Sequence, residues 1–114
     1  MPDAPNERLA GLVAVLGEDD VRDLVRLFLE SYPGILLEIA SGDRSRSHRA
    51  AHNLKSSSQQ MGVPALAARM LQLEHRLANP GGAVTPADLD GIAADFAQAE
   101  GALRAFAGPG ASSP

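Results

Sequence analysis

The sequence predicts an all-α fold, an antiparallel up-down four-helix bundle with a short extra helix at its N-terminal end. Ala and Leu dominate the 45% of the 114 residues that are apolar, and aromatic residues make up only 4%, which favours helix over sheet. Apolar residues recur at spacings of three and four along five segments, which Gly and Pro separate. The short connections between the long segments are typical of antiparallel neighbours in a bundle.

The first two helices are expected on either side of Gly17. A short helix begins at Pro5-Asn6, and its apolar stripe consists of Leu9, Leu12, Val13 and Leu16. A longer helix begins with the acids of residues 18–20, which suit the positive end of a helix dipole. Pro33-Gly34 interrupts this segment, but its apolar spacing continues to Ile39. We therefore expect one long helix with a kink.

Three further helices complete the predicted bundle. The third runs over about residues 43–61 and ends in the turn Gly62-Val63-Pro64, whose proline suits the first position of the fourth helix. The loop of residues 79–82 ends the fourth. The fifth begins at residues 85–88, which offer an N-cap threonine, a proline and an acid for a capping box. The apolar stripes of these last two helices are Leu66, Met70, Leu73 and Leu77, then Leu89, Ile92, Phe96, Ala99, Leu103 and Phe106.

Length, charge and cysteine content limit what this chain can be. We expect one domain over residues 1–107 and a disordered tail over residues 108–114, which are rich in Gly, Pro and Ser. Fourteen Asp and Glu against ten Lys and Arg give a net charge of −4, which argues against nucleic acid as a partner. No cysteine is available for disulfides or thiolate metal sites. No membrane span or secretion signal is present, so a cytoplasmic protein is expected.

One surface of the predicted third helix collects polar and basic residues. At 100° per residue, its core face consists of Ser47, Ala51, Leu54, Ser58 and Met61. The opposite face consists of His48, His52, Lys55, Ser56 and Gln59. Lys55, the only lysine in the chain, lies one turn after His52, where its ammonium would neutralise an anionic group attached to the ring. Arg44, Arg46 and Arg49 make this surface basic in an acidic protein.

A glutamate on the next helix is the candidate partner of His52. His52 lies ten residues before Gly62 and Glu74 lies twelve residues after it, so the two reach similar heights on adjacent antiparallel helices. Glu74 would accept a hydrogen bond from one ring nitrogen and leave the other free to act as a nucleophile. The neighbouring His75 and Arg76 are expected to be ordinary surface residues.

The segment around His52 resembles the signature of histidine phosphotransfer (HPt) domains, which act in multistep phosphorelays. It reads AHNLKSSSQQMG over residues 51–62 and is followed by Leu66, Leu73 and Glu74. A histidine three residues before a lysine is a weak signal by itself. Here the pattern H-x-L-K-S-S-S lies in a helical hairpin, with a glycine ten residues after the histidine. The preceding helix over residues 21–43 is also similar, so the resemblance covers roughly Leu9 to Leu77.

The resemblance implies a carrier that holds a phosphoryl group without hydrolysing it. His52 would accept the group from an aspartyl phosphate on a receiver domain, or from a hybrid sensor histidine kinase, and pass it to a response regulator. Lys55 would stabilise the added charge, Gln59 would position the partner or the phosphate, and Ser56 stands where the family often has glycine. The chain is expected to act as a monomer with no cofactor of its own. Mg²⁺ would come with the receiver domain, because this sequence has no carboxylate cluster for it.

The basic residues of the third helix favour an acidic partner. We expect His48, Arg46 and Arg49 to contact it, because a basic surface that meets an acidic cleft speeds encounter. A docking module that binds receiver domains or a kinase without carrying phosphate is the main alternative, and the presence of both His52 and Lys55 disfavours it. Nucleic-acid binding through residues 44–49 is disfavoured because no aromatic residues are interleaved there.

Two other chemistries fit this helix poorly. His48 and His52 have the i, i+4 spacing of helical metal ligands, but a metal site needs further ligands and Lys55 repels a cation. The serines of residues 56–58 could suggest a hydrolase. They lack the sharp turn and the oxyanion loop of a hydrolase nucleophile, and small residues for close helix packing explain them better.

Overall fold

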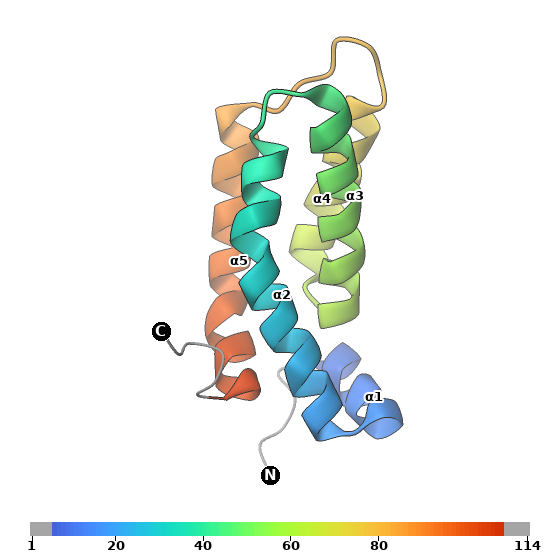
Figure 1. Ribbon diagram of the computed structural model, residues 1–114, viewed down its shortest axis with the longest axis vertical. Coiled ribbons are helices and arrows are strands. Elements are labelled where there is room, and N and C mark those ends of the chain that lie inside the picture. Colours follow the sequence, from blue (N-terminus) through green and yellow to red (C-terminus); the bar gives the residue numbers. More distant parts are fainter. Residues whose placement is uncertain (1–5, 109–114) are drawn as a thin grey trace.

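The computed structural model describes residues 6–108, and all regular structure in this range is helical. The helices are α1 (Glu7–Leu16), α2 (Glu18–Ile39), α3 (Arg44–Met61), α4 (Pro64–Leu77) and α5 (Pro86–Ala107). Helices α2 to α5 lie alongside one another and α1 lies at one end of the group (Figure 1). The all-α prediction is therefore confirmed. Residues 1–5 and 109–114, which include most of the predicted tail, lie outside the described residues.

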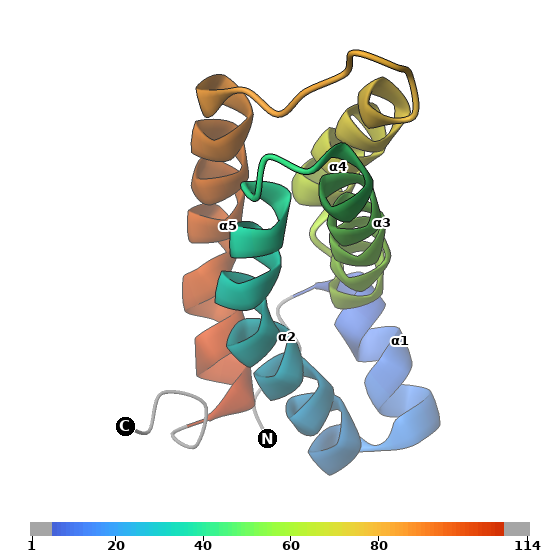
Figure 2. The same ribbon diagram turned by 45° about the horizontal axis from the view of Figure 1, so that its top comes forward.

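Helix α3 packs against α2 and against α4, and the contact with α4 is the most extensive in the structure. Helix α5 contacts α2 and α4, and α1 contacts α2 and α3. Figure 2 shows α1 at one end of α3 and the long connection between α4 and α5 at the opposite end. This packing leaves an outer face of α3 open to solvent between its two neighbours.

The predicted core face of α3 is buried over its whole length. Each of its five residues is at most 2% exposed, and the apolar stripe predicted for α4 is equally buried. In α2, the residues Val25, Leu29 and Tyr32 also join the core, and Tyr32 stacks on Phe96 with ring centroids 3.6 Å apart. Leu16 is instead 45% exposed, so its place in the predicted stripe of the first helix is wrong. It is the last residue of α1, beyond the part of this helix that packs on the bundle.

The helix ends use the residues that the sequence indicates. Asp43 is the N-cap of α3 and accepts a hydrogen bond from the amide of Arg46 at 2.9 Å. Thr85 and Asp88 form the expected capping box at the start of α5, with distances of 3.2 and 2.8 Å. Helix α2 continues through Pro33 as one helix, as predicted, and the kink at this proline stays a prediction.

Arg76 fastens the connection between α4 and α5. Its Nη1 donates to Asp88 Oδ2 at 2.6 Å and to the carbonyl of Ala83 at 3.3 Å. Burial raises the pKa of Asp88, but hydrogen bonds from Arg76 and Thr85 outweigh burial and hold this pKa below its usual value. Arg76 is exposed, as expected of a surface residue, and its side chain in addition bonds across the loop to Asp88.

The start of α1 is bonded to the turn between α3 and α4. Asn6 caps α1 by accepting a hydrogen bond from the amide of Leu9 at 2.8 Å, and its Nδ2 donates to the carbonyl of Met61 at 2.9 Å. Gly62 has a φ of 72°, in the left-handed region, and a Cβ at this position would overlap the side chain of Asn6. Conformation and space therefore both require glycine in this turn.

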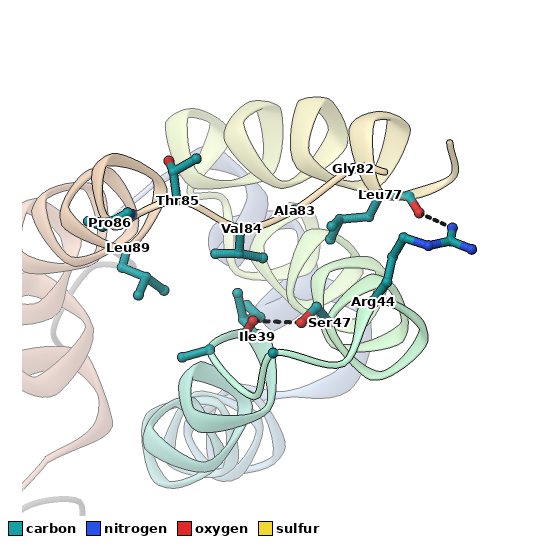
Figure 3. A pocket seen from close by; sticks show the side chains of 12 residues that line it. Ile39, Arg44, Ser47, Leu77, Gly82, Ala83, Val84, Thr85, Pro86 and Leu89 are labelled. Atoms are coloured by element: carbon teal, nitrogen blue, oxygen red, sulfur yellow. Dashed lines mark hydrogen bonds between the residues drawn. The ribbon is translucent and has the colours of Figure 1, made fainter. Parts of the chain in front are cut away.

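A cavity of about 260 Å³ lies where the α2–α3 and α4–α5 connections meet (Figure 3). At its edge, Arg44 donates to the carbonyl of Leu77 at 2.7 Å, and the hydroxyl of Ser47 donates to the carbonyl of Ile39 at 2.7 Å. These bonds join the first turn of α3 to α4 and α2. These bonds help to position α3. His52 does not line the cavity, so the cavity is separate from the candidate site.

Candidate functional site

The outer face of α3 presents the polar residues that the helical periodicity placed there. His52, Ser56 and Gln59 are exposed, while His48 and Lys55 are half-buried. The predicted division of α3 into a core face and a polar face is confirmed. Because the core face carries small residues such as Ala51 and Ser58, α2 and α4 can approach α3 closely. We call the polar face between these two helices the ridge of α3.

Glu74 on α4 joins His52 and Lys55 on α3. The ring Nδ1 of His52 lies 2.7 Å from Glu74 Oε2, and Lys55 Nζ donates to Glu74 Oε1 at 2.7 Å. The expected contact between His52 and Glu74 is therefore present. Lys55 was expected beside the imidazole, and its bond to the second carboxylate oxygen was not foreseen. The side chain of His52 is 53% exposed, whereas those of Lys55 and Glu74 are 17% and 14% exposed.

The two partners of Glu74 keep its carboxylate charged. The hydrogen bond from Lys55 is the largest reason why the pKa of Glu74 is lower than usual, and the hydrogen bond from His52 also lowers it. Partial burial raises the pKa of Glu74 but does not cancel these effects. A carboxylate accepts hydrogen bonds and does not donate them, so it requires the proton of a neutral imidazole to lie on Nδ1.

This tautomer determines which edge of the ring is available for chemistry. With the proton on Nδ1, the lone pair of the neutral ring is on Nε2, at the edge turned away from Glu74. A neutral imidazole nitrogen on a half-exposed ring is a nucleophile that another macromolecule can reach. Lys55 contributes a cation within one helical turn of the ring. The arrangement can therefore accept an electrophilic group and compensate added negative charge.

A basic depression adjoins His52 between α3 and α4. Among its lining residues are Arg44, His48, Arg49, His52 and Glu74. The structure thus brings His48 and Arg49, two of the predicted partner-binding residues, to the side of His52. Arg46 lies towards α2, where its Nε is 4.0 Å from a carboxylate oxygen of Glu38.

The remaining predicted residues extend along the ridge away from this depression. Ser56 is exposed one turn after His52. Gln59 follows about two turns after His52 and lines a different depression, together with Pro64 and Leu71 of α4. The structure therefore does not bring Gln59 together with the His52–Glu74 pair in one hollow.

Comparison with known protein families identifies the class of this chain. A family model described as the Hpt domain matches residues 23–102, which is more than half of the sequence. The chain therefore belongs to the Hpt domain family, whose function is histidine phosphotransfer in phosphorelays. Hpt domains interact with receiver domains and kinases. No curated protein and no solved structure matches this chain.

Two further properties concern residues 6–108. No group of three or more His, Asp or Glu side chains in this range is arranged to hold a metal ion. Among the described residues, His48 and His52 therefore have no third side chain with which to form a metal site. None of the described helices is both long and apolar enough to cross a membrane.

Proposed function

We propose that His52 is the phosphoryl acceptor of this Hpt domain and that the chain is an intermediate in a phosphorelay. One observation carries the proposal. The carboxylate of Glu74 binds His52 at Nδ1, on the surface of a helix, so that Nε2 holds the lone pair at the open edge of the ring. His48 and His75 have no comparable carboxylate partner among the described residues, so His52 is the histidine best prepared for nucleophilic attack.

The proposed transfer is an in-line displacement at phosphorus. The lone pair of His52 Nε2 attacks the phosphorus of an aspartyl phosphate on a receiver domain, and the bond between phosphorus and the aspartate oxygen breaks. The bonding electrons leave with the aspartate as a carboxylate. The proton on Nδ1 stays on the ring, which becomes a cationic phosphoimidazole, and the adjacent Glu74 carboxylate compensates that charge. Transfer to a response regulator reverses these steps on a second aspartate.

The neighbouring residues are proposed to act on charge and access. An ammonium group has three N–H donors. Lys55 can therefore keep its hydrogen bond to Glu74 and use another N–H to stabilise the phosphoryl oxygens. Ser56, small and exposed, leaves room over the ring, and Gln59 helps to position the partner. The receiver domain supplies Mg²⁺, and the chain supplies no cofactor. The donor can also be a hybrid sensor histidine kinase.

The wider setting is part of the same proposal. A monomeric single domain, arranged as an antiparallel up-down four-helix bundle, would present the ridge of α3 to cytoplasmic partners. His48, Arg46 and Arg49 would contact these partners, because the basic charge of the three residues complements an acidic phosphorylation pocket.

Transfer of radiolabel tests this function. Receiver domains encoded by the same genome are phosphorylated with radiolabelled acetyl phosphate and incubated with the full chain. We expect label on the chain that is stable in alkali and labile in acid, as phosphohistidine is, and no label on His52→Gln. His75→Gln, at an exposed histidine of α4 with no proposed role, is the matched control and should be labelled like the wild type.

Three outcomes would contradict the proposal in different ways. Label that persists on His52→Gln would place the acceptor at another residue. A chain that binds receiver domains but takes no label from any of them would be a docking module. A chain that neither binds nor takes label would not act in a relay with these partners.

A further inference from the structure

The cavity where the α2–α3 and α4–α5 connections meet is lined mainly by apolar side chains. The ends of α2 and α4, the connection between α4 and α5 and the start of α5 contribute Ile39, Leu77, Val84, Pro86 and Leu89. Figure 3 shows Val84 opposite Ile39. Ile39 and Leu77 are at most 1% exposed, so the cavity opens onto the core of the bundle. Segments that are distant in the sequence therefore surround one apolar space.

The polar side chains in the wall of this cavity already have partners. The hydroxyl of Ser47 donates to the carbonyl of Ile39 at 2.7 Å. The hydroxyl of Thr85 donates to Asp88 Oδ2 at 3.0 Å and accepts from the amide of Asp88 at 3.2 Å. A molecule inside the cavity would therefore be held mainly by apolar contact.

The size of the cavity limits what it can hold. An apolar cavity of about 150 Å³ is large enough to bind benzene. The cavity of this chain measures about 260 Å³. A single ring with a short substituent, or a short branched chain, fits this volume, whereas drug-sized ligands occupy pockets of about 300–1,000 Å³.

One cation lies at the edge of the cavity. Arg44 donates from Nη1 to the carbonyl of Leu77 at 2.7 Å, and a guanidinium has five N–H donors. Arg44 forms no ion pair within residues 6–108, and no acidic residue lines the cavity. Its planar group can therefore bind a carboxylate through two parallel hydrogen bonds.

The positive charge continues beyond Arg44. The basic depression beside His52 shares Arg44 and Leu77 with the cavity, and it adds Arg49. The acid of this depression, Glu74, is already bonded through both of its carboxylate oxygens. An apolar space and a positively charged surface thus meet at Arg44. This combination suits a molecule with an apolar body and one anionic group.

We propose that the cavity and Arg44 form a binding site for a small apolar carboxylic acid. The apolar part of the acid fills the space between Val84 and Ile39, and its carboxylate pairs with Arg44. One guanidinium balances the single charge of a carboxylate, whereas a phosphate monoester carries nearly two charges. The site is separate from the chemistry of His52, so this inference does not depend on the proposed function.

Occupation of this site should stabilise the folded chain. The bound acid would contact the end of α2, the first turn of α3, the end of α4 and the start of α5 at once. These surfaces come together only in the folded state, so the acid binds the folded chain in preference to the unfolded one. The melting temperature should therefore rise with the concentration of the acid.

Phenylacetate is the probe for the first test, and phenylacetamide is its uncharged analogue of nearly the same shape. Both are titrated into the full chain while the backbone amides are observed by NMR. We expect phenylacetate to bind with a dissociation constant of about 1 mM or lower and to shift the amides of Ile39 and Val84. Phenylacetamide should bind about tenfold more weakly, because it lacks the charge that Arg44 recognises.

Two variants test the two parts of the site. Val84→Phe fills the cavity and should weaken binding of both probes about tenfold or more. Arg44→Gln should weaken binding of phenylacetate and make it equal to that of phenylacetamide. The matched controls are Val15→Phe and Arg8→Gln, both on α1, where neither residue lines the cavity or the basic depression. The controls should bind phenylacetate within about twofold of the wild type.

Three results would overturn the inference. Absence of saturable binding would show that the cavity is not a site for such acids. Equal binding of phenylacetate and phenylacetamide to the wild type would remove the role of Arg44. Amide shifts confined to residues around His52 would place the acid in the basic depression alone. The comparison of the two probes needs no substitution, so it stands even if a variant fails to fold. Label transfer to His52 tests the proposed function separately.

Discussion

The imidazole of His52 and the carboxylate of Glu74 are 22 residues apart in the sequence and lie 2.7 Å apart across the contact between α3 and α4. Glu74 is 14% exposed and His52 is 53% exposed, so the pair has one shielded member and one accessible member. The shielded carboxylate fixes the ring, and the accessible ring is left to react.

Replacing Glu74 by Gln should slow phosphorylation of His52 without unfolding the domain. A neutral amide can hydrogen-bond to the ring but does not compensate the charge of the phosphoimidazole, and it no longer requires the proton to lie on Nδ1. By analogy with partners that orient metal-bound histidines, the rate should fall about tenfold to a hundredfold. Nitrogen NMR of His52 should show the proton distributed over both ring nitrogens. An unchanged tautomer and an unchanged rate would contradict the role given to Glu74.

The charge state of Glu74 should make the stability of the fold depend on pH in the acid range. The pKa of Glu74 is lowered in the folded chain, chiefly by Lys55, whereas in the unfolded chain it should be about 4.3. The stabilisation of the fold by charged Glu74 is therefore fully present above about pH 4.3. It is lost as the pH falls from there through the lower pKa that Glu74 has in the folded chain. Urea unfolding at a series of pH values measures this loss.

Asp88, whose pKa is also lowered, contributes in the same direction, so a single-site comparison is needed. Glu74→Gln should lose less stability than the wild type between neutral pH and about pH 3, because its side chain does not titrate. If the free energy of unfolding changes with pH equally in the two proteins, the protonation of Glu74 does not contribute to the pH dependence of stability.

Lys55→Ala should slow transfer while the domain stays folded. The side chain is 17% exposed and its ammonium bonds to Glu74, so its loss removes both a cation near the phosphoryl group and a partner of the carboxylate. Lys55→Arg keeps the charge and is the matched control. If transfer falls equally in both variants, the geometry of the ammonium matters and not its charge alone. An unchanged rate in Lys55→Ala would remove the proposed role.

Gly62→Ala should destabilise the fold by about 1 kcal/mol or more, because alanine is strained at positive φ and its Cβ would displace Asn6. Asn6→Ala should cost about 0.5–2 kcal/mol through loss of the cap on α1. The control is Gly101→Ala, in a helix with open surroundings, which should raise stability by about 0.5–1 kcal/mol. Denaturant titrations measure all three. Equal effects at Gly62 and Gly101 would refute the account of the turn.

Sequence reasoning succeeded where the information is local. The capping box of Thr85 and Asp88 lies within four consecutive residues, and the two faces of α3 follow from its period. The contact of His52 with Glu74 could be counted outwards from the turn because both helices adjoin it. The burial of Tyr32 depends on the position of Phe96 on another helix, and nothing near it in the sequence reports that position.

The long, charged side chains were harder to place. Arg76 reaches across a loop to Asp88, and Lys55 turns towards Glu74 rather than lying free beside the ring. The partner of each side chain depends on which carboxylate lies within hydrogen-bonding distance after the helices have packed. Asn6 is a similar case, because its bond to the carbonyl of Met61 joins residues that are 55 positions apart.

The turn between α3 and α4 is only two residues long, Gly62 and Val63, and it sets the register of His52 against Glu74. One inserted residue would rotate α4 by about 100° relative to α3 and carry the carboxylate away from the ring. Surface connections usually tolerate changes of length, as the loop of residues 79–82 should. This turn should not, so natural variants that keep the histidine are expected to preserve both its length and the glycine at position 62.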